Sequence, residues 1–286
     1  MINSQSATIQ YFVEHLQAIW RDIYDGCQSD YLDLIGQTAT LTLNAIALGE
    51  MPYHNLEHTI LVTTAGQEML RGKYLLEGNI SCQEWVQTIL ALLCHDVGYI
   101  GGVCEQDRIG NGCCCYTTGV GDEIVSLPHD TTDASLAPYH VDRGKQFVEE
   151  HLSGHPLVDV EAIKLNVELT RFPSPKEPLY QSTSNLPGLV RAADLVGQLS
   201  DPDYLAKLPA LFSEFEEIGT NRALGYQHPR DLRSGYPSFY RNVAYPYIKD
   251  GMRYLKVTQR GRDIVTDLYN NVTVVENELS RYSVCS

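Results

Sequence analysis

The stretch Tyr53-His54-Asn55-Leu56-Glu57-His58 places two histidines four residues apart. On a helix, residues at this spacing lie on one face, so His54 and His58 can point into the same pocket. Further along the chain, the apolar run at residues 89–94 ends in the dipeptide His95-Asp96. Imidazole and carboxylate groups together are ligands that divalent metal ions bind. The sequence therefore predicts a metal site built by helices.

A structural role for these residues is the alternative, since a histidine on an apolar helix face is more often a hydrogen-bonded core residue than a ligand. Residues 88–94 carry no charge, and burying His95 and Asp96 beside them without partners costs free energy. A metal ion satisfies both groups. Asp194 lies in another mostly apolar helical stretch, where it could pair with Arg191 at helical spacing. Taken with the other clusters, Asp194 supplies a fourth ligand.

The order of these clusters on a helical background resembles the HD superfamily of metal-dependent phosphohydrolases. Tyr53–His58 and the segment Ala-Leu-Leu-Cys-His-Asp-Val at residues 91–97 are similar to the first two motifs of class I cyclic nucleotide phosphodiesterases. Three later segments resemble the same family in order: Leu136–His140, Ala193–Leu195 and the aromatic segment Phe239–Pro246. The resemblance spans most of residues 50–250. It implies an all-α, HD-domain or PDEase-like helical bundle.

The resemblance also implies roles for individual residues. His58, His95, Asp96 and Asp194 would hold the first of one or two divalent ions (Zn, Mg, Mn or Fe), and Asp96 would bridge to the second. In that family a hydroxide between two ions attacks phosphorus in line, and a histidine, here His54, protonates the departing sugar oxygen. Metal-bound water and imidazole both titrate near neutral pH, which suits this chemistry. Residues expected at the substrate or behind the ligands are Asn55, Tyr99, His140, Tyr236 and Phe239.

Two positions depart from the phosphodiesterase pattern. Tyr99 stands where the family has a second histidine, which supports the water shell near the second metal. Tyr236 stands where the purine-reading glutamine is expected if Phe239 is the aromatic clamp. The leading interpretation is a 3',5'-cyclic nucleotide phosphodiesterase. An HD-type nucleotidase or phosphomonoesterase stays open, as does a noncatalytic metal-dependent nucleotide sensor, although a sensor would not need His54 as a general acid.

Residues 98–137 are rich in glycine and cysteine. Glycine at this density disfavours helix and favours tight turns, so we expect a long irregular insertion, without a strand pair, that covers the mouth of the site. Its Cys104, Cys113, Cys114 and Cys115, with His129, could supply zinc ligands. However, no Cys-x-x-Cys pair is present, and three consecutive cysteines do not easily reach one tetrahedral ion. Reduced thiols are the favoured interpretation.

Composition favours one globular domain over residues 1–286, since the chain is 43% hydrophobic and has no apolar run near the ~20 residues of a membrane helix. The net charge of -15 argues against binding a nucleic acid polymer, because such proteins need a basic surface. A small phosphoester stays compatible, because bound metal ions reverse the local field. The N-terminus lacks a secretory pattern, so we expect a cytoplasmic protein with reduced thiols. The oligomeric state is left open.

Apolar residues recur at helical spacing along most of the chain. Helices are predicted around Ile9–Trp20 and Leu32–Ile46 and at Tyr53–Tyr74, Cys82–Val97, Val141–Leu152, Val158–Thr170, Leu186–Leu199, Asp203–Ile218, Ser238–Leu255 and Gly261–Tyr282. Pro173, Pro175 and Pro178 predict a linker after Arg171. This linker would let the next helix bring Asp194 back toward the histidines.

Overall fold

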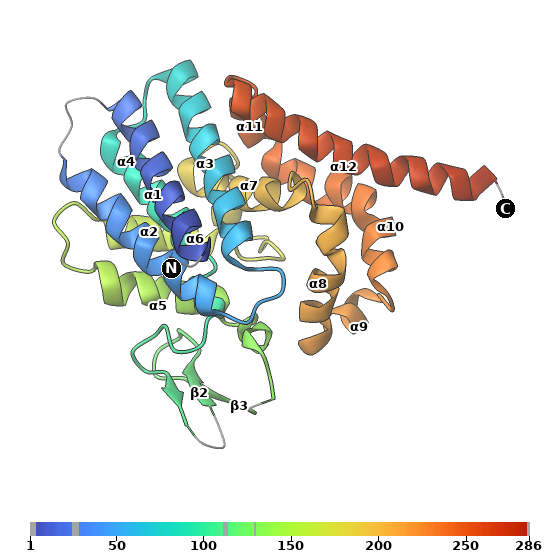
Figure 1. The fold of residues 1–286 in the computed structure, drawn as a ribbon, viewed down its shortest axis with the longest axis horizontal. Coiled ribbons are helices and arrows are strands. Elements are labelled where there is room, and N and C mark those ends of the chain that lie inside the picture. The colour runs from blue at the N-terminus through green and yellow to red at the C-terminus, as the bar shows by residue number, and fades with distance from the viewer. Residues whose placement is uncertain (1–3, 25–28, 111–113, 129, 285–286) are drawn as a thin grey trace.

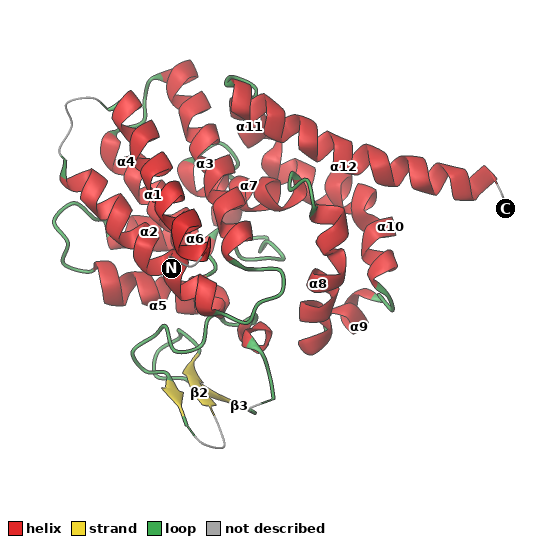
Figure 2. Ribbon diagram, viewed as in Figure 1, coloured by secondary structure: helices red, strands yellow, loops and turns green. Residues whose placement is uncertain are grey.

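The computed structural model describes residues 4–24, 29–110, 114–128 and 130–284. These residues are mostly helical, as the periodicity predicts (Figure 2). The helices are α1 (Ser4–Ile23), α2 (Asp30–Leu48), α3 (Leu56–Glu77), α4 (Cys82–Cys94), α5 (His140–Leu152), α6 (Val160–Glu168), α7 (Leu186–Leu199), α8 (Tyr204–Glu217), α9 (Thr220–Leu224), α10 (Pro229–Phe239), α11 (Tyr245–Leu255) and α12 (Gln259–Val284). None of the described helices combines the length and apolar character needed to cross a bilayer.

Helices α3, α4 and α7 form the centre of the helical body. Every residue of α4 from Trp85 to Cys94 is buried, which explains why its sequence is mostly apolar. Helix α7 approaches α3 closely because Gly197 has no side chain: a Cβ there would lie 2.6 Å from the Cα of Val62. This contact brings the middle of α7, with Asp194, toward the first turn of α3.

Helix α3 begins later than the sequence predicts, so His54 is not part of it. Asn55 adopts an extended conformation and caps the helix, its side chain accepting hydrogen bonds from the backbone N–H groups of Glu57 and His58. The expectation that His54 and His58 share a helix face was therefore wrong. The strong N-cap preference of asparagine outweighs the helical spacing of the histidines.

The predicted helix Ser238–Leu255 is divided between α10 and α11, with one wider π turn between them at Tyr240–Ala244. Pro246 lies at the start of α11. Since proline has no backbone N–H for the regular helical hydrogen bond, the chain changes its winding just before it. The short helix α9 and the part of α10 before Ser238 were not predicted.

The insertion at residues 98–137 contains a three-stranded antiparallel sheet of β1 (Arg108–Ile109), β2 (Cys114–Thr117) and β3 (Ile124–Leu127), in the order β1-β2-β3. The expectation of no strand pair was wrong. Gly119 and Gly121, with φ of 79° and 55°, turn the chain between β2 and β3. The strands have two to four residues each, too few for an alternation of apolar and polar residues to be recognised in the sequence. The sheet projects from one end of the helical body (Figure 1).

Arg143 of α5 fastens the insertion to the helices. Its fully buried guanidinium donates to the carbonyl oxygens of Gly98 (2.7 Å), Ile100 (2.8 Å) and Thr117 (2.8 Å). It also donates to the two carboxylate oxygens of Asp107, at 2.9 and 3.0 Å. All five N–H groups of the arginine are therefore used. This buried pair sets the path of the insertion.

The cysteines of the described residues do not form a metal cluster. Cys82, Cys94, Cys104 and Cys115 are free thiols, and no described cysteine belongs to a group that could hold a metal ion. Cys113 and His129, considered above as zinc ligands, lie outside the described residues.

Candidate metal centre

Four predicted ligands come together where three helices meet. His58 lies in the first turn of α3, His95 and Asp96 follow the last turn of α4, and Asp194 lies in the middle of α7. The Oδ2 atom of Asp96 lies 3.2 Å from His58 Nε2 and 3.1 Å from His95 Nε2. The Oδ1 atom of Asp194 lies 3.6 and 3.7 Å from the same two nitrogens. Two imidazoles and two carboxylates thus face one point.

Three of these buried atoms have no hydrogen-bond partner of acceptable geometry: His58 Nε2, His95 Nε2 and Asp96 Oδ2. Leaving such atoms unpaired is costly. Ligands about 2.0–2.2 Å from a shared ion lie about 3.0 Å apart at octahedral angles and about 3.4 Å apart at tetrahedral angles. The observed spacings of 3.1 to 3.7 Å fit a divalent ion among the four side chains.

The charges around the site favour a cation. Burial alone would lower the pKa of His58, but the carboxylates of Asp194 and Asp96 raise it to about 10. Burial likewise opposes the charged form of His95, whose pKa is nonetheless raised by Asp96 and Asp194. Burial would raise the pKa of Asp96, yet His95 and His58 lower it well below its usual range. The negative C-terminal end of the α4 dipole adds to this preference for positive charge.

Solvent reaches the group from the side of Asp194. The side chains of His58, His95 and Asp96 are at most 5% exposed, whereas that of Asp194 is 23% exposed. The alternative partner of Asp194 is engaged elsewhere: Arg191 donates to Ser174 Oγ and to the carbonyl oxygens of Tyr180 and Ser182. Asp194 is therefore oriented toward the histidines rather than toward Arg191.

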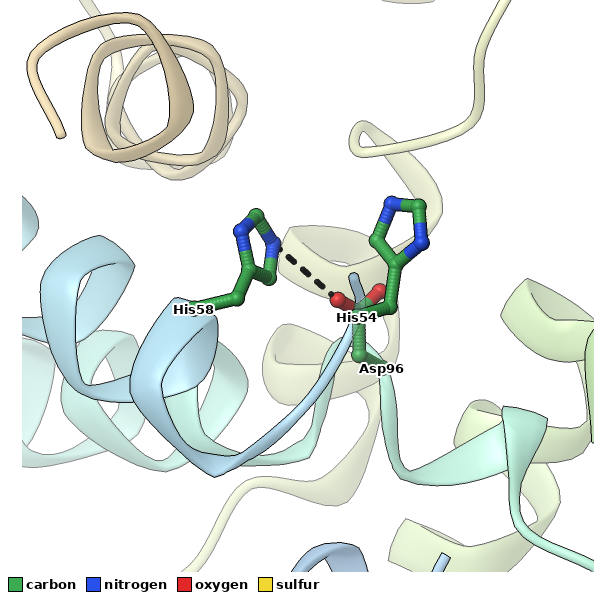
Figure 3. A group of neighbouring side chains, drawn as sticks. All are labelled: His54, His58 and Asp96. Atoms are coloured by element: carbon green, nitrogen blue, oxygen red, sulfur yellow. Dashed lines mark ion pairs between the residues drawn. The ribbon is translucent and has the colours of Figure 1, made fainter. Parts of the chain in front are cut away.

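His54 lies beside the four ligands and is held by a glutamate. Figure 3 shows the carboxylate of Asp96 between the rings of His58 and His54. Glu214 Oε2 lies 2.5 Å from His54 Nδ1, and Glu214 Oε1 accepts the backbone N–H groups of Tyr53 (2.6 Å) and His54 (3.1 Å). Burial raises the pKa of Glu214, but His54 and these amides outweigh it and lower the pKa. An ionised Glu214 assigns the proton of Nδ1 and leaves Nε2 facing the ligands.

Glu214 was missed by the sequence analysis, although a signal for it exists. In the predicted helix Asp203–Ile218, Tyr204, Leu208 and Leu211 recur at helical spacing and are buried. Glu214 continues this apolar stripe and is 4% exposed. A carboxylate on the buried face of a helix needs a partner, and here that partner is His54.

Tyr99 and His140 extend the site on the side of His54. The ring of Tyr99 is stacked on both imidazoles, with centroids 5.0 Å from His54 and 4.2 Å from His140. His140 Nδ1 lies 2.6 Å from the carbonyl oxygen of Ala137, which leaves Nε2 as the free nitrogen. Burial lowers the pKa of His140, with Asp96 opposing this effect. His140 is therefore a neutral imidazole near Asp96.

A family model described as Npun_R2479-like matches residues 2–278. The chain belongs to this Npun_R2479-like family. The match includes the four candidate ligands, the insertion and Glu214. No curated protein matches the chain.

Three further residues expected at the substrate have other contacts in this Npun_R2479-like protein. Asn55 caps α3, and its Nδ2 group donates to the carbonyl oxygen of Pro52. Tyr236 is 2% exposed, packs on Tyr204 and donates its hydroxyl proton to the carbonyl oxygen of Leu199. Tyr236 is therefore a core residue and not part of a substrate pocket. Phe239 is half-buried and makes an edge contact with Phe172, at 6.0 Å between ring centroids.

A separate acidic group in this Npun_R2479-like chain is already neutralised in part. Glu57, Asp201 and Asp203 lie close together at the start of α3 and α8. The ammonium group of Lys207 lies 2.9 Å from Glu57 and 2.7 Å from Asp201. This group therefore differs from the candidate metal centre in having a cation of its own.

Proposed function

We propose that the chain is a metal-dependent phosphohydrolase of the HD type, with a 3',5'-cyclic nucleotide as the leading substrate. The observation that carries the proposal is the convergence of unpartnered Nε2 atoms of His58 and His95 on two carboxylates. A histidine paired with a buried glutamate lies beside them. The order of these residues along the chain is also that of the HD phosphohydrolases.

The proposed ligands are His58, His95, Asp96 and Asp194. One ion of Zn, Mg, Mn or Fe would be held by all four, and Asp96 would also contact a second. When bound, a divalent ion supplies Lewis-acid chemistry: it lowers the pKa of water toward neutrality and offsets charge on phosphoryl oxygens. The mixed nitrogen and oxygen ligands suit several of these metals, so selectivity depends on supply as well as geometry.

In the proposed reaction, His54 donates a proton from Nε2 to the departing oxygen. Glu214 supports this role because its carboxylate accepts a hydrogen bond from the Nδ1–H group and fixes the orientation of the ring. Proton donation of this kind contributes roughly 10²- to 10⁴-fold to a rate. His140, neutral and close enough to feel the charge of Asp96, would accept a hydrogen bond from the attacking water.

A nucleotidase or other phosphomonoesterase reaction is the second candidate. It is favoured by Tyr236, whose buried hydroxyl is bonded to Leu199 and so does not read a base. It is also favoured by Tyr99, which brings no metal-binding nitrogen to the side of Asp96. A small phosphoester is the substrate in both cases, and the two reactions differ in their product: a cyclic diester gives a monoester, whereas a monoester gives free phosphate.

The test is metal content by elemental analysis, followed by hydrolysis of a chromogenic phosphodiester and a monoester with and without manganese. We expect at least one metal equivalent and metal-dependent turnover. His54→Ala should lower turnover of an alkyl phosphodiester, whose leaving oxygen needs a proton, roughly 10²- to 10⁴-fold while the metal stays bound, and His151→Ala, on the exposed side of α5, serves as its control.

Glu214→Gln should lower turnover by a smaller factor, about 10- to 100-fold, because His54 itself remains. Metal loss in His54→Ala equal to that in His58→Ala would overturn the assignment of His54 as an acid. A protein that binds metal and nucleotide without any turnover would be the noncatalytic sensor instead.

A further inference from the structure

A second, small apolar cluster lies behind His54, apart from the main core. It consists of Ile46, Met51, Tyr99, Ile100 and Ala134. These residues come from three segments: the chain from the end of α2 to His54, the chain just after Asp96, and the short 3-10 helix η2 (Asp133–Leu136) that ends the insertion. The cluster therefore joins the insertion to the loop that carries the proposed acid.

Asp133 supplies the polar contacts of this cluster. Its Oδ2 atom accepts the backbone N–H of Glu50 at 2.9 Å, and its Oδ1 atom accepts the backbone N–H of Gly101 at 2.9 Å. Glu50 begins the loop that ends at His54, and Gly101 lies two residues after Tyr99, whose ring is stacked on His54. The Asp133 carboxylate thus fixes the loop that carries His54 and the segment whose Tyr99 ring is stacked on His54.

Helix α8 holds the same arrangement from the other side. Glu217 accepts hydrogen bonds from the backbone N–H of Thr132 (2.9 Å) and from the hydroxyls of Thr132 (2.7 Å) and Ser135 (2.5 Å). Glu214, three residues earlier on the same face of α8, holds His54. Helix α8 therefore holds both the end of the insertion and the proposed acid, His54.

We propose that Asp133 is a positioning residue for His54. The inference rests on the proposed function, in which Nε2 of His54 must meet the departing oxygen, and such reactions are sensitive to small displacements of the donor. Glu214 fixes the imidazole through Nδ1. Asp133 fixes the start of its loop and, through Gly101, the ring of Tyr99 against its face. The insertion thereby takes part in the reaction through its stem while its sheet projects away (Figure 1).

The experiment compares Asp133→Asn with Asp130→Asn, a matched change at an exposed position of the same insertion. Asparagine keeps one acceptor oxygen but turns an N–H donor toward the other amide. The hydrolysis rates of two substrates are measured with the metal-loaded protein. One is an alkyl phosphodiester, whose leaving oxygen needs a proton, and the other is a p-nitrophenyl phosphodiester, whose leaving group does not. Amide hydrogen exchange of residues 49–55 is followed in parallel. Glu217→Gln is the second variant, in case Asp133→Asn does not fold.

Asp133→Asn should slow the alkyl ester about tenfold, slow the p-nitrophenyl ester much less, leave bound metal unchanged and speed amide exchange in residues 49–55. Glu217→Gln should act in the same direction. Equal effects on both esters, or unchanged exchange, would overturn the inference. If the unmodified protein hydrolyses neither ester, the proposed function has failed, and the exchange rates still decide whether Asp133 holds the loop of His54.

Discussion

The candidate metal-ligand group and the contact between Arg143 and Asp107 are both built from buried charged side chains, but they differ in how the polar atoms of these side chains are paired. All five N–H groups of Arg143 have acceptors, and the Asp107 oxygens also accept the backbone N–H groups of Gly102 and Thr117. In the ligand group, three buried polar atoms lack such partners. Burial of charge alone therefore does not mark a functional site; the candidate site is marked by three unpaired buried atoms that lie within a few ångströms of one another.

Removal of a candidate ligand should have the largest effect on the molecule. We expect Asp96→Asn to weaken metal binding more than about a hundredfold, since even partners behind the ligands contribute about 10- to 100-fold. Activity that depends on the metal should fall with it. Metal content after dialysis measures the effect. Asp203→Asn is the control, because Asp203 belongs to the separate acidic group near Lys207. Full metal content in Asp96→Asn would remove the basis of the proposed site.

Arg143→Met tests the satisfied region. It leaves the buried carboxylate of Asp107 without its cation, which should lower the free energy of unfolding by about 3–5 kcal/mol. The double variant Arg143→Met, Asp107→Leu should recover part of this loss, because it removes the unpaired charge as well. Urea unfolding measures both. A loss of metal affinity as large as that of Asp96→Asn would show that the two regions are not distinct.

Addition of metal should stabilise only proteins in which the candidate ligands are intact. A ligand that binds only the folded state, present at a hundred times its dissociation constant, adds about 2.7 kcal/mol to the free energy of unfolding. We expect this increment in the unmodified protein and in Arg143→Met, and its absence in Asp96→Asn. Unfolding with and without manganese or zinc gives the values, and an equal increment in all three proteins would contradict the assignment.

A third group, on α5 and α6, should have the smallest effect. Glu168 contacts Arg171, Lys145 and Tyr180, and although burial opposes it, these partners lower the pKa of Glu168 to about 2. Because the folded pKa lies below the ordinary value, the contribution to stability is present above pH 4.5 and is lost as the pH falls toward 2. Partial exposure limits it to about 1 kcal/mol.

The measurement for this group is the free energy of unfolding at pH 6 and at pH 3. Glu168→Gln should lose less stability over this interval than the unmodified protein, and Glu161→Gln, a change in the largely exposed partner of Lys164, should not differ from it. An identical pH dependence in all three proteins would show that Glu168 contributes nothing to folding.

Local patterns predicted the parts of the fold that local forces determine. Helix α7 spans the predicted residues Leu186–Leu199, and the predicted ligands lie together because they lie on, or directly after, the central helices α3, α4 and α7. His54 was assigned to a helix because spacing does not reveal that Asn55 caps the N-terminus of α3 and leaves His54 outside it. The HD-type assignment and the single domain over residues 1–286 stay predictions.

Contacts between segments far apart in the sequence were not predicted. Glu214 meets His54 across 160 residues, and the sheet in the insertion depends on Arg143 as well as on glycine turns. Tyr236 matched an aromatic pattern, but the packing of α10 on Tyr204 buries it. Such pairings follow from how helices pack, which periodicity along one segment does not describe.

The close approach of Gly197 to the backbone of Val62 has a consequence for how freely the sequence can drift. The span between His58 and Asp194 is set by backbone lying on backbone, so exchanges among apolar side chains elsewhere in the core leave it nearly unchanged. A single methyl group at position 197 would instead act as a wedge between the two helices. The span between these two candidate ligands is thus sensitive to a change at a residue that has no side chain of its own.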